Sequence, residues 1–178
     1  MLQITTKFEG NGVKTLQMLP GVVQKSANRA VKEAMTHMRA QLVRETVAKY
    51  YITAARIRKA MTISGTTLKV SGHSELIHHY KISPKNRGKK SPLVKAAVKR
   101  GGLKSLGNKA FLLKTGKGAV VMKREGGKRL PIRPVFGPAI PQIVGNEETI
   151  EALEAEVQEY FQKRMDYWTM RAIGAVKA

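Results

Sequence analysis

The chain has 178 residues and no cysteine. It is long enough for one domain with a sizeable core, and it can form neither a disulfide framework nor a thiolate metal site. Its 33 lysines and arginines against 12 acidic residues give a formal net charge of +21, whereas a magnitude of about 2–8 is usual for a small domain. Such a charge favours a nucleic acid or an acidic protein surface as partner.

The charge is distributed unevenly along the chain. Residues 76–124 contain fourteen lysines and arginines and no acidic residue, whereas residues 147–159 contain six glutamates and no basic residue. No apolar run is long enough for a membrane span or for the core of a secretory signal. We therefore expect a polarised protein that is made in the cytoplasm and has no membrane partner.

Two long amphipathic helices are predicted. Apolar residues recur at helical spacing through residues 22–50, which contain no glycine or proline. The second helix, about 147–172, follows the N-cap candidate Asn146 and carries glutamates in its first turns, where the helix dipole favours negative charge. A short basic helix is expected at 54–61. We disfavour a helix-turn-helix motif there, because strands rather than a third helix follow.

The remaining regular segments are predicted strands. Alternating apolar residues favour strands near 2–9, 67–72, 75–83, 110–115 and 119–124, and the last two form a hairpin. Residues 129–133 are expected to add an edge strand, because prolines flank and interrupt them. We expect one α+β domain over residues 1–178, in which a mainly antiparallel sheet packs on the two long helices.

A basic segment, about residues 84–109, interrupts these strands. Its glycine and lysine content predicts a flexible insertion that becomes ordered only in an assembly, with one or two helical turns at 93–98. Its cations are candidate contacts for a partner protein or for DNA. The candidate contacts are Lys85, Arg87, Lys89, Lys90, Lys99, Arg100 and Lys104.

Four of the seven prolines lie in residues 129–142. Proline lacks the N–H group and fixes φ, so this stretch is expected to be neither helix nor central strand. Its apolar residues allow two interpretations: a connector packed over its own core, or a stiff surface for a neighbouring subunit. In the second, Phe136 is the anchor and two arginines pair with the last helix of a neighbour. The predicted interface residues are Arg129, Arg133, Phe136, Glu147, Glu148 and Glu151.

Two stretches also carry a family resemblance. The proline-rich stretch reads RLPIRPVFGPAIPQIVGN and leads into the acidic helix, and the first long helix ends with RETVAKYYITAARIRKAMTI and leads into strands. Together these features resemble the minor tail protein Z family of tailed bacteriophages. The resemblance covers most of the chain in its order of elements, while residues 84–109 match in character alone.

The resemblance implies a structural virion protein that completes the tail at its head-proximal end, in the neck and tail terminator region, and joins the tail to the head. It implies a homo-oligomeric ring, with a hexamer favoured, whose partners are tail tube and neck proteins, with packaged DNA as a further contact. Ring assembly is head to tail, so each subunit needs two unlike complementary surfaces. The basic middle and the acidic helix are candidates for that pair.

The sequence contains no catalytic signature. Its Gly-Lys pairs lack the following Ser or Thr of a phosphate-binding loop, and its single aspartate, Asp166, lies on a predicted amphipathic helix. His73, His78 and His79 have only Glu75 as a nearby further ligand, so we interpret them as polar strand residues rather than as a metal site. We expect neither an enzyme nor a cofactor.

The alternative function is a basic nucleic-acid-binding module, such as a ribosome-associated or DNA-binding protein. Its phosphate contacts would come from the basic middle. The low aromatic content argues against it, because Tyr80 and Phe111 lie only at the margins of that segment and single-strand binders need stacking platforms.

Overall fold

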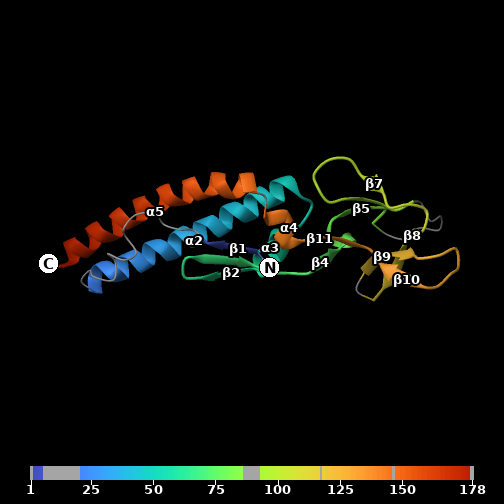
Figure 1. Cartoon of the computed structure of the whole chain (residues 1–178), viewed down its shortest axis with the longest axis horizontal. Helices are drawn as coiled ribbons and strands as arrows, with labels where there is room; N and C mark the ends of the chain where they lie inside the picture. Colours follow the sequence, from blue (N-terminus) through green and yellow to red (C-terminus); the bar gives the residue numbers. More distant parts are fainter. Residues whose placement is uncertain (1, 6–20, 86–92, 117, 146, 177–178) are drawn as a thin grey trace.

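The computed structural model describes residues 2–5, 21–85, 93–116, 118–145 and 147–176. It confirms the predicted α+β fold, with two long helices and short antiparallel strands. The molecule is elongated, and the two long helices lie at one end while a β-rich region lies at the other (Figure 1). None of the described helices is long and apolar enough to span a membrane.

The long helices are α2 (Gly21–Lys49) and α5 (Glu147–Val176), which lie side by side and run in opposite directions (Figure 1). We call this pair the helical hairpin. Both start within one residue of the position that the apolar spacing and the N-cap signal predict. Their apolar stripes meet, and burial removes these side chains from water. The fully buried side chains of the two helices include Met35, Met38, Leu42 and Val157.

A small sheet lies beside the helical hairpin (Figure 1). It has the order β1-β3-β2, with β1 (Leu2–Thr5), β2 (Met61–Ser64) and β3 (Thr67–Val70), and all pairs are antiparallel. The short helix α3 (Ala54–Ala60) leads directly into β2, a strand that the sequence analysis does not predict. Gly65 occupies the tight turn after β2 with a φ of 59°, which glycine adopts without steric cost.

The β-rich region, which we call the β lobe, spans the described residues from 74 to 139 (Figure 1). The predicted single sheet is wrong, because these strands form three further small sheets: β5-β6-β7, β8-β9-β10 and β4-β11. Each described strand pairs only within its own group, so no hydrogen-bonded ladder of the described residues connects the three sheets. The strands are β4 (Ser74–Leu76), β5 (Lys81–Ser83), β6 (Lys95–Ala97), β7 (Lys104–Ser105), β8 (Ala110–Thr115), β9 (Gly118–Arg124), β10 (Ile132–Pro134) and β11 (Phe136–Ala139), with a 3₁₀ turn at Ile77–His79.

One apolar core joins the helical hairpin to the β lobe. Leu42 of α2 and Val157 of α5 belong to the same buried cluster as Val94, Leu112 and Val121 of the lobe. The lobe is therefore packed on the body of the molecule, and its surface is positioned by the same contacts that stabilise the helices.

The proline-rich segment is partly as predicted. Strand β10 lies at the edge of its sheet, as expected of a strand that contains proline. The expectation that no helix forms in residues 129–142 is wrong, because α4 (Ile140–Val144) begins there. Pro141 lies in the first turn of α4, where the missing N–H group would have no partner in the helix.

Residues 84–109 contain secondary structure that the sequence analysis does not expect. Strands β6 and β7 lie within this segment, and Val94 and Ala96 are buried. The predicted helical turn at 93–98 is wrong, since this stretch includes β6. Lys95 is exposed while its small neighbours Ala96 and Ala97 are both buried, so no regular apolar alternation marks this strand in the sequence. The predicted ordering on assembly stays a prediction.

Candidate functional site

The proline-rich segment presents two large apolar side chains to solvent. Phe136 is 54% exposed and Leu130 is 65% exposed, whereas Ile140 at the start of α4 is buried. The interpretation in which Phe136 fills the core of its own chain is therefore wrong. The segment is held in the core at its C-terminal side and displays apolar surface at its N-terminal side.

The position of Phe136 is set by rigid neighbours. Strand β11 pairs with β4, which places Phe136 opposite Leu76. The hydroxyl of Tyr80 donates a hydrogen bond of 2.8 Å to the carbonyl oxygen of Pro138. Burial raises the pKa of Tyr80 to about 12, so its hydroxyl remains protonated and able to donate. Gly137 packs so closely on this ring that an added Cβ would lie 2.7 Å from Cε2 of Tyr80.

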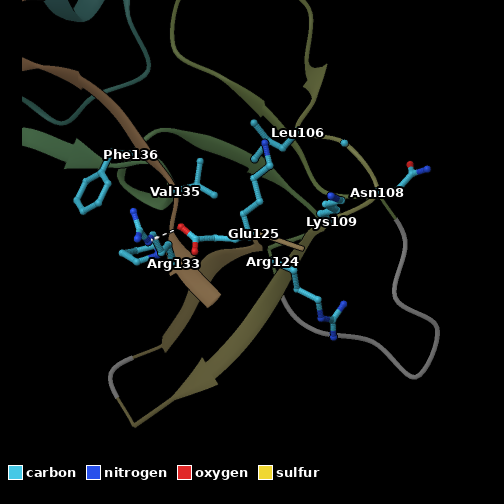
Figure 2. Close-up of a pocket in the computed structure, with 11 residues that line it drawn as sticks. Leu106, Asn108, Lys109, Arg124, Glu125, Arg133, Val135 and Phe136 are labelled. Atoms are coloured by element: carbon cyan, nitrogen blue, oxygen red, sulfur yellow. Dashed lines mark ion pairs between the residues drawn. The ribbon is translucent and has the colours of Figure 1, made fainter. Parts of the chain in front are cut away.

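Phe136 lies at the rim of an open hollow of about 780 Å³. Figure 2 shows its walls, which come from the loop at 106–109, the end of β9, the end of β10 and the start of β11. Arg124 reaches out of the hollow, and its Cζ lies 4.6 Å from the ring centroid of Phe111. The charged residues of the wall are Lys109, Lys123, Arg124, Arg133 and Glu125. This combination of positive charge and exposed apolar surface suits an acidic protein surface.

Among the described side chains, Arg133 pairs with a carboxylate of its own lobe rather than with a glutamate of α5. Nε of Arg133 lies 2.5 Å from Oε1 of Glu125, and this is the pair marked in Figure 2. Arg129 is exposed, as is Glu151 in the first turns of α5. Glu147 and Glu148 begin α5, but their side chains are outside the described part of the structure. Contact between these groups on neighbouring subunits stays a prediction.

The predicted basic contacts divide into two sets. Lys85, Lys99, Arg100 and Lys104 are described, and all four are exposed. Arg87, Lys89 and Lys90 lie outside the described residues. The backbone N–H of Arg100 donates to the carbonyl oxygen of Lys49 at 2.8 Å, so this part of the basic segment is fixed to the end of α2.

The sequence analysis misses Tyr50 and Tyr51. They follow α2 and lie far along the chain from the basic segment, so no local pattern connects them to it. The structure brings them together through a bridge between Tyr50 and Lys99 and a hydrogen bond from the N–H of Tyr51 to the carbonyl oxygen of Val98. The fold therefore places two tyrosine rings beside the cations of the basic segment, although that segment itself contains no aromatic residue.

The histidines form a small polar cluster. Nδ1 of His79 lies 2.5 Å from Oε2 of Glu75, and Nη1 of Arg56 lies 3.0 Å from the same oxygen. Burial lowers the pKa of His78, which favours its neutral form. His78 and His79 lie on the 3₁₀ turn rather than on the predicted strand. No group of three or more potential metal ligands occurs among the described residues.

Comparisons with protein-family models, with curated proteins and with solved structures find no match to this chain.

Proposed function

We propose that this chain is a structural subunit of a bacteriophage tail that assembles in a ring and completes the tail at its head-proximal end. The proposal joins the sequence resemblance to one observation: the proline-rich segment that carries the resemblance displays Phe136 and Leu130 on the surface. A large apolar side chain on a rigid strand is typical of the anchor of a protein interface.

The shape of the segment supports this role. Strand pairing and the hydrogen bond between Tyr80 and Pro138 hold Phe136 in position before any partner binds. Ordering a flexible segment on binding would cost about 1–2 kcal/mol per residue of backbone. A segment that is already ordered avoids much of this cost, which favours association.

The charge distribution supports a head-to-tail arrangement. The β lobe is strongly basic, and α5 begins with the acidic stretch at residues 147–159. These unlike surfaces lie on different elements, so the lobe of one subunit can meet the acidic start of α5 on the next. In this arrangement Arg129 and Arg133 face Glu147, Glu148 and Glu151 of a neighbour.

The resemblance also carries the rest of the proposal. It favours a hexameric ring in the virion, with the tail tube and neck proteins as its partners and no catalytic role. A ring at that place surrounds the path of packaged DNA.

The test replaces Phe136 by alanine. We expect this change to lower the free energy of unfolding by less than about 1 kcal/mol, because the side chain is largely exposed. We expect it to abolish ring formation, measured by size-exclusion chromatography with light scattering, alone and with purified tail tubes. Leu93→Ala is the matched control, because Leu93 is an equally exposed apolar residue of the β lobe outside the segment.

Two results would contradict the proposal. If the wild-type chain stays monomeric both alone and with tail tubes, the proposed ring assembly is wrong. A Phe136→Ala variant that assembles normally but loses about 3–5 kcal/mol of stability would make Phe136 a structural residue.

A further inference from the structure

A second hollow, of about 550 Å³, lies where the end of α2 meets the β lobe. We call it the Tyr51 hollow, and the residues used below are Tyr50, Tyr51, Lys81, Lys85 and Arg100. We propose that it binds the phosphodiester backbone of a nucleic acid. A single subunit contains all of these residues, so the site does not depend on the proposed ring.

The fold holds two cations against one aromatic ring. Nζ of Lys81 lies 4.8 Å from the ring centroid of Tyr51 and 3.4 Å from its hydroxyl oxygen. Cζ of Arg100 lies 5.3 Å from the same centroid, and its Nε donates to the carbonyl oxygen of Val47 at 3.0 Å. The ring attracts each cation, but this attraction is weak at an exposed site.

The positive charge of the Tyr51 hollow is not neutralised by its own walls. None of its described lining residues is an aspartate or a glutamate. The nearby carboxylate of Glu75 already pairs with Arg56 and His79. Lys85 is exposed at the same hollow and adds a third cation. Like charges held close together repel one another, so an anion that enters the hollow is favoured.

A nucleic acid fits this arrangement better than an acidic protein. Lys99 and Lys104 continue the exposed cations along the same segment, and no acidic residue occurs from 76 to 124. A duplex carries one negative charge per about 1.7 Å of its axis, whereas protein surfaces usually mix both signs. The guanidinium and ammonium groups both bind phosphate oxygens.

The tyrosines position the cations and do not read bases. The ring of Tyr51 already has Lys81 and Arg100 as neighbours, and Nζ of Lys99 lies 6.0 Å from the centroid of Tyr50. These rings therefore offer little free face for stacking. We expect binding to depend on the backbone and to be largely independent of sequence.

The experiment measures binding of a short, fluorescently labelled DNA duplex by anisotropy at several salt concentrations. The test variant is Lys81→Gln with Lys85→Gln, two exposed side chains at the hollow. The control is Lys114→Gln with Lys128→Gln, which removes the same charge from exposed positions of the β lobe that do not line the hollow. Circular dichroism confirms that both variants fold.

We expect the test variant to bind at least tenfold more weakly at moderate salt. The slope of log K against log salt is negative, and its magnitude should decrease by about 0.9 for each lost phosphate contact. The control should change affinity less than threefold, because it alters only the general field. Equal losses in the two variants would overturn the site, since they would show that net charge alone drives binding.

Two further measurements test the parts of the proposal. Tyr51→Leu should weaken binding severalfold without changing the salt slope, because it disperses the cations but removes none, while Tyr51→Phe should bind as the wild type. Unchanged affinity of Tyr51→Leu would overturn the positioning role. Polyglutamate is the competing ligand. If it binds as tightly as the duplex, and if the Lys81 and Lys85 substitutions weaken its binding equally, the partner is an acidic protein rather than a nucleic acid.

Discussion

The helical hairpin and the β lobe differ in how far their charged side chains are paired within the chain. In the hairpin, polar side chains pair across the two helices: Glu33 with Arg164, and Glu156 with His37. The lobe carries a long series of cations. The acidic residue between β9 and β10, Glu125, is already paired with Arg133. The hairpin therefore neutralises much of its charge internally, whereas the lobe presents an excess of positive charge outward.

This difference indicates a division of labour. The hairpin stabilises the fold through buried apolar stripes and internal ion pairs. The lobe uses short strands, packed on the same core, to display cations and the exposed Phe136. Surface charge of one sign is unfavourable in isolation and favourable against a complementary partner.

The largest expected effect tests whether the two regions unfold together. Leu42 is fully buried in the cluster that also contains Leu112 and Val121 of the lobe. Leu42→Ala should lower the free energy of unfolding by about 2–5 kcal/mol, because it removes apolar contacts and leaves a cavity. Denaturant unfolding should show the same shift by the fluorescence of Trp168, which lies on α5, and by hydrogen exchange of the lobe amides. A shift seen only at Trp168 would make the lobe an independent unit.

A smaller effect is expected inside the lobe, where the proline-rich segment packs on Tyr80. In Gly137→Ala, the new Cβ would lie 2.7 Å from Cε2 of Tyr80, a buried ring held by its hydrogen bond to Pro138. We expect a loss of about 1–3 kcal/mol in denaturant unfolding, as for an overpacked site. Gly127→Ala is the control, because nothing lies within 4 Å of its added Cβ. Equal stability of the two variants would show that Tyr80 moves freely.

The smallest effect concerns the ion pairs of the helical hairpin. The hydrogen bond from Arg164 lowers the pKa of Glu33, and that with His37 lowers the pKa of Glu156, below the ordinary 4.5. Glu33→Gln should cost about 0.2–1 kcal/mol at neutral pH, since the pair is partly exposed.

The pH dependence follows from the direction of these shifts. A lowered pKa in the folded state gives stabilisation that is complete above the unfolded value and is lost as the pH falls through the folded value. The difference between wild type and Glu33→Gln should therefore be present at neutral pH and vanish in strong acid. A difference that persists unchanged in acid would show that the charge of Glu33 does not contribute.

The sequence predicts the elements that carry a strong local period. Helix α2, helix α5 and the hairpin of β8 and β9 lie within a few residues of their expected positions. Their apolar residues repeat over several turns or several pairs, so the pattern remains clear despite the surrounding lysines. The short β2, β6 and β7 escape prediction because two to four residues cannot establish a period.

The candidate sites are only partly readable from the sequence. Phe136 can be identified from the sequence because the prolines around it exclude the interior of a helix and a central strand, where an aromatic residue is usually buried. The Tyr51 hollow depends instead on the pairing of Tyr50 with Lys99, a contact between distant parts of the chain. Helix α4 is not predicted because it contains Pro141. Proline is unfavourable in the interior of a helix but is well suited to the first turn, where Pro141 lies.

The length of the helical hairpin has a mechanical consequence. Helix α5 has 30 residues, which corresponds to a rod of about 45 Å. Its first turns lie near the β lobe and its last turns lie at the far end of the molecule (Figure 1). A tilt of about 10° at the lobe therefore moves the distal tip by about 8 Å, given the rise of 1.5 Å per residue. The length of the hairpin therefore amplifies any rotation of the whole subunit about its lobe into a larger displacement of the opposite end.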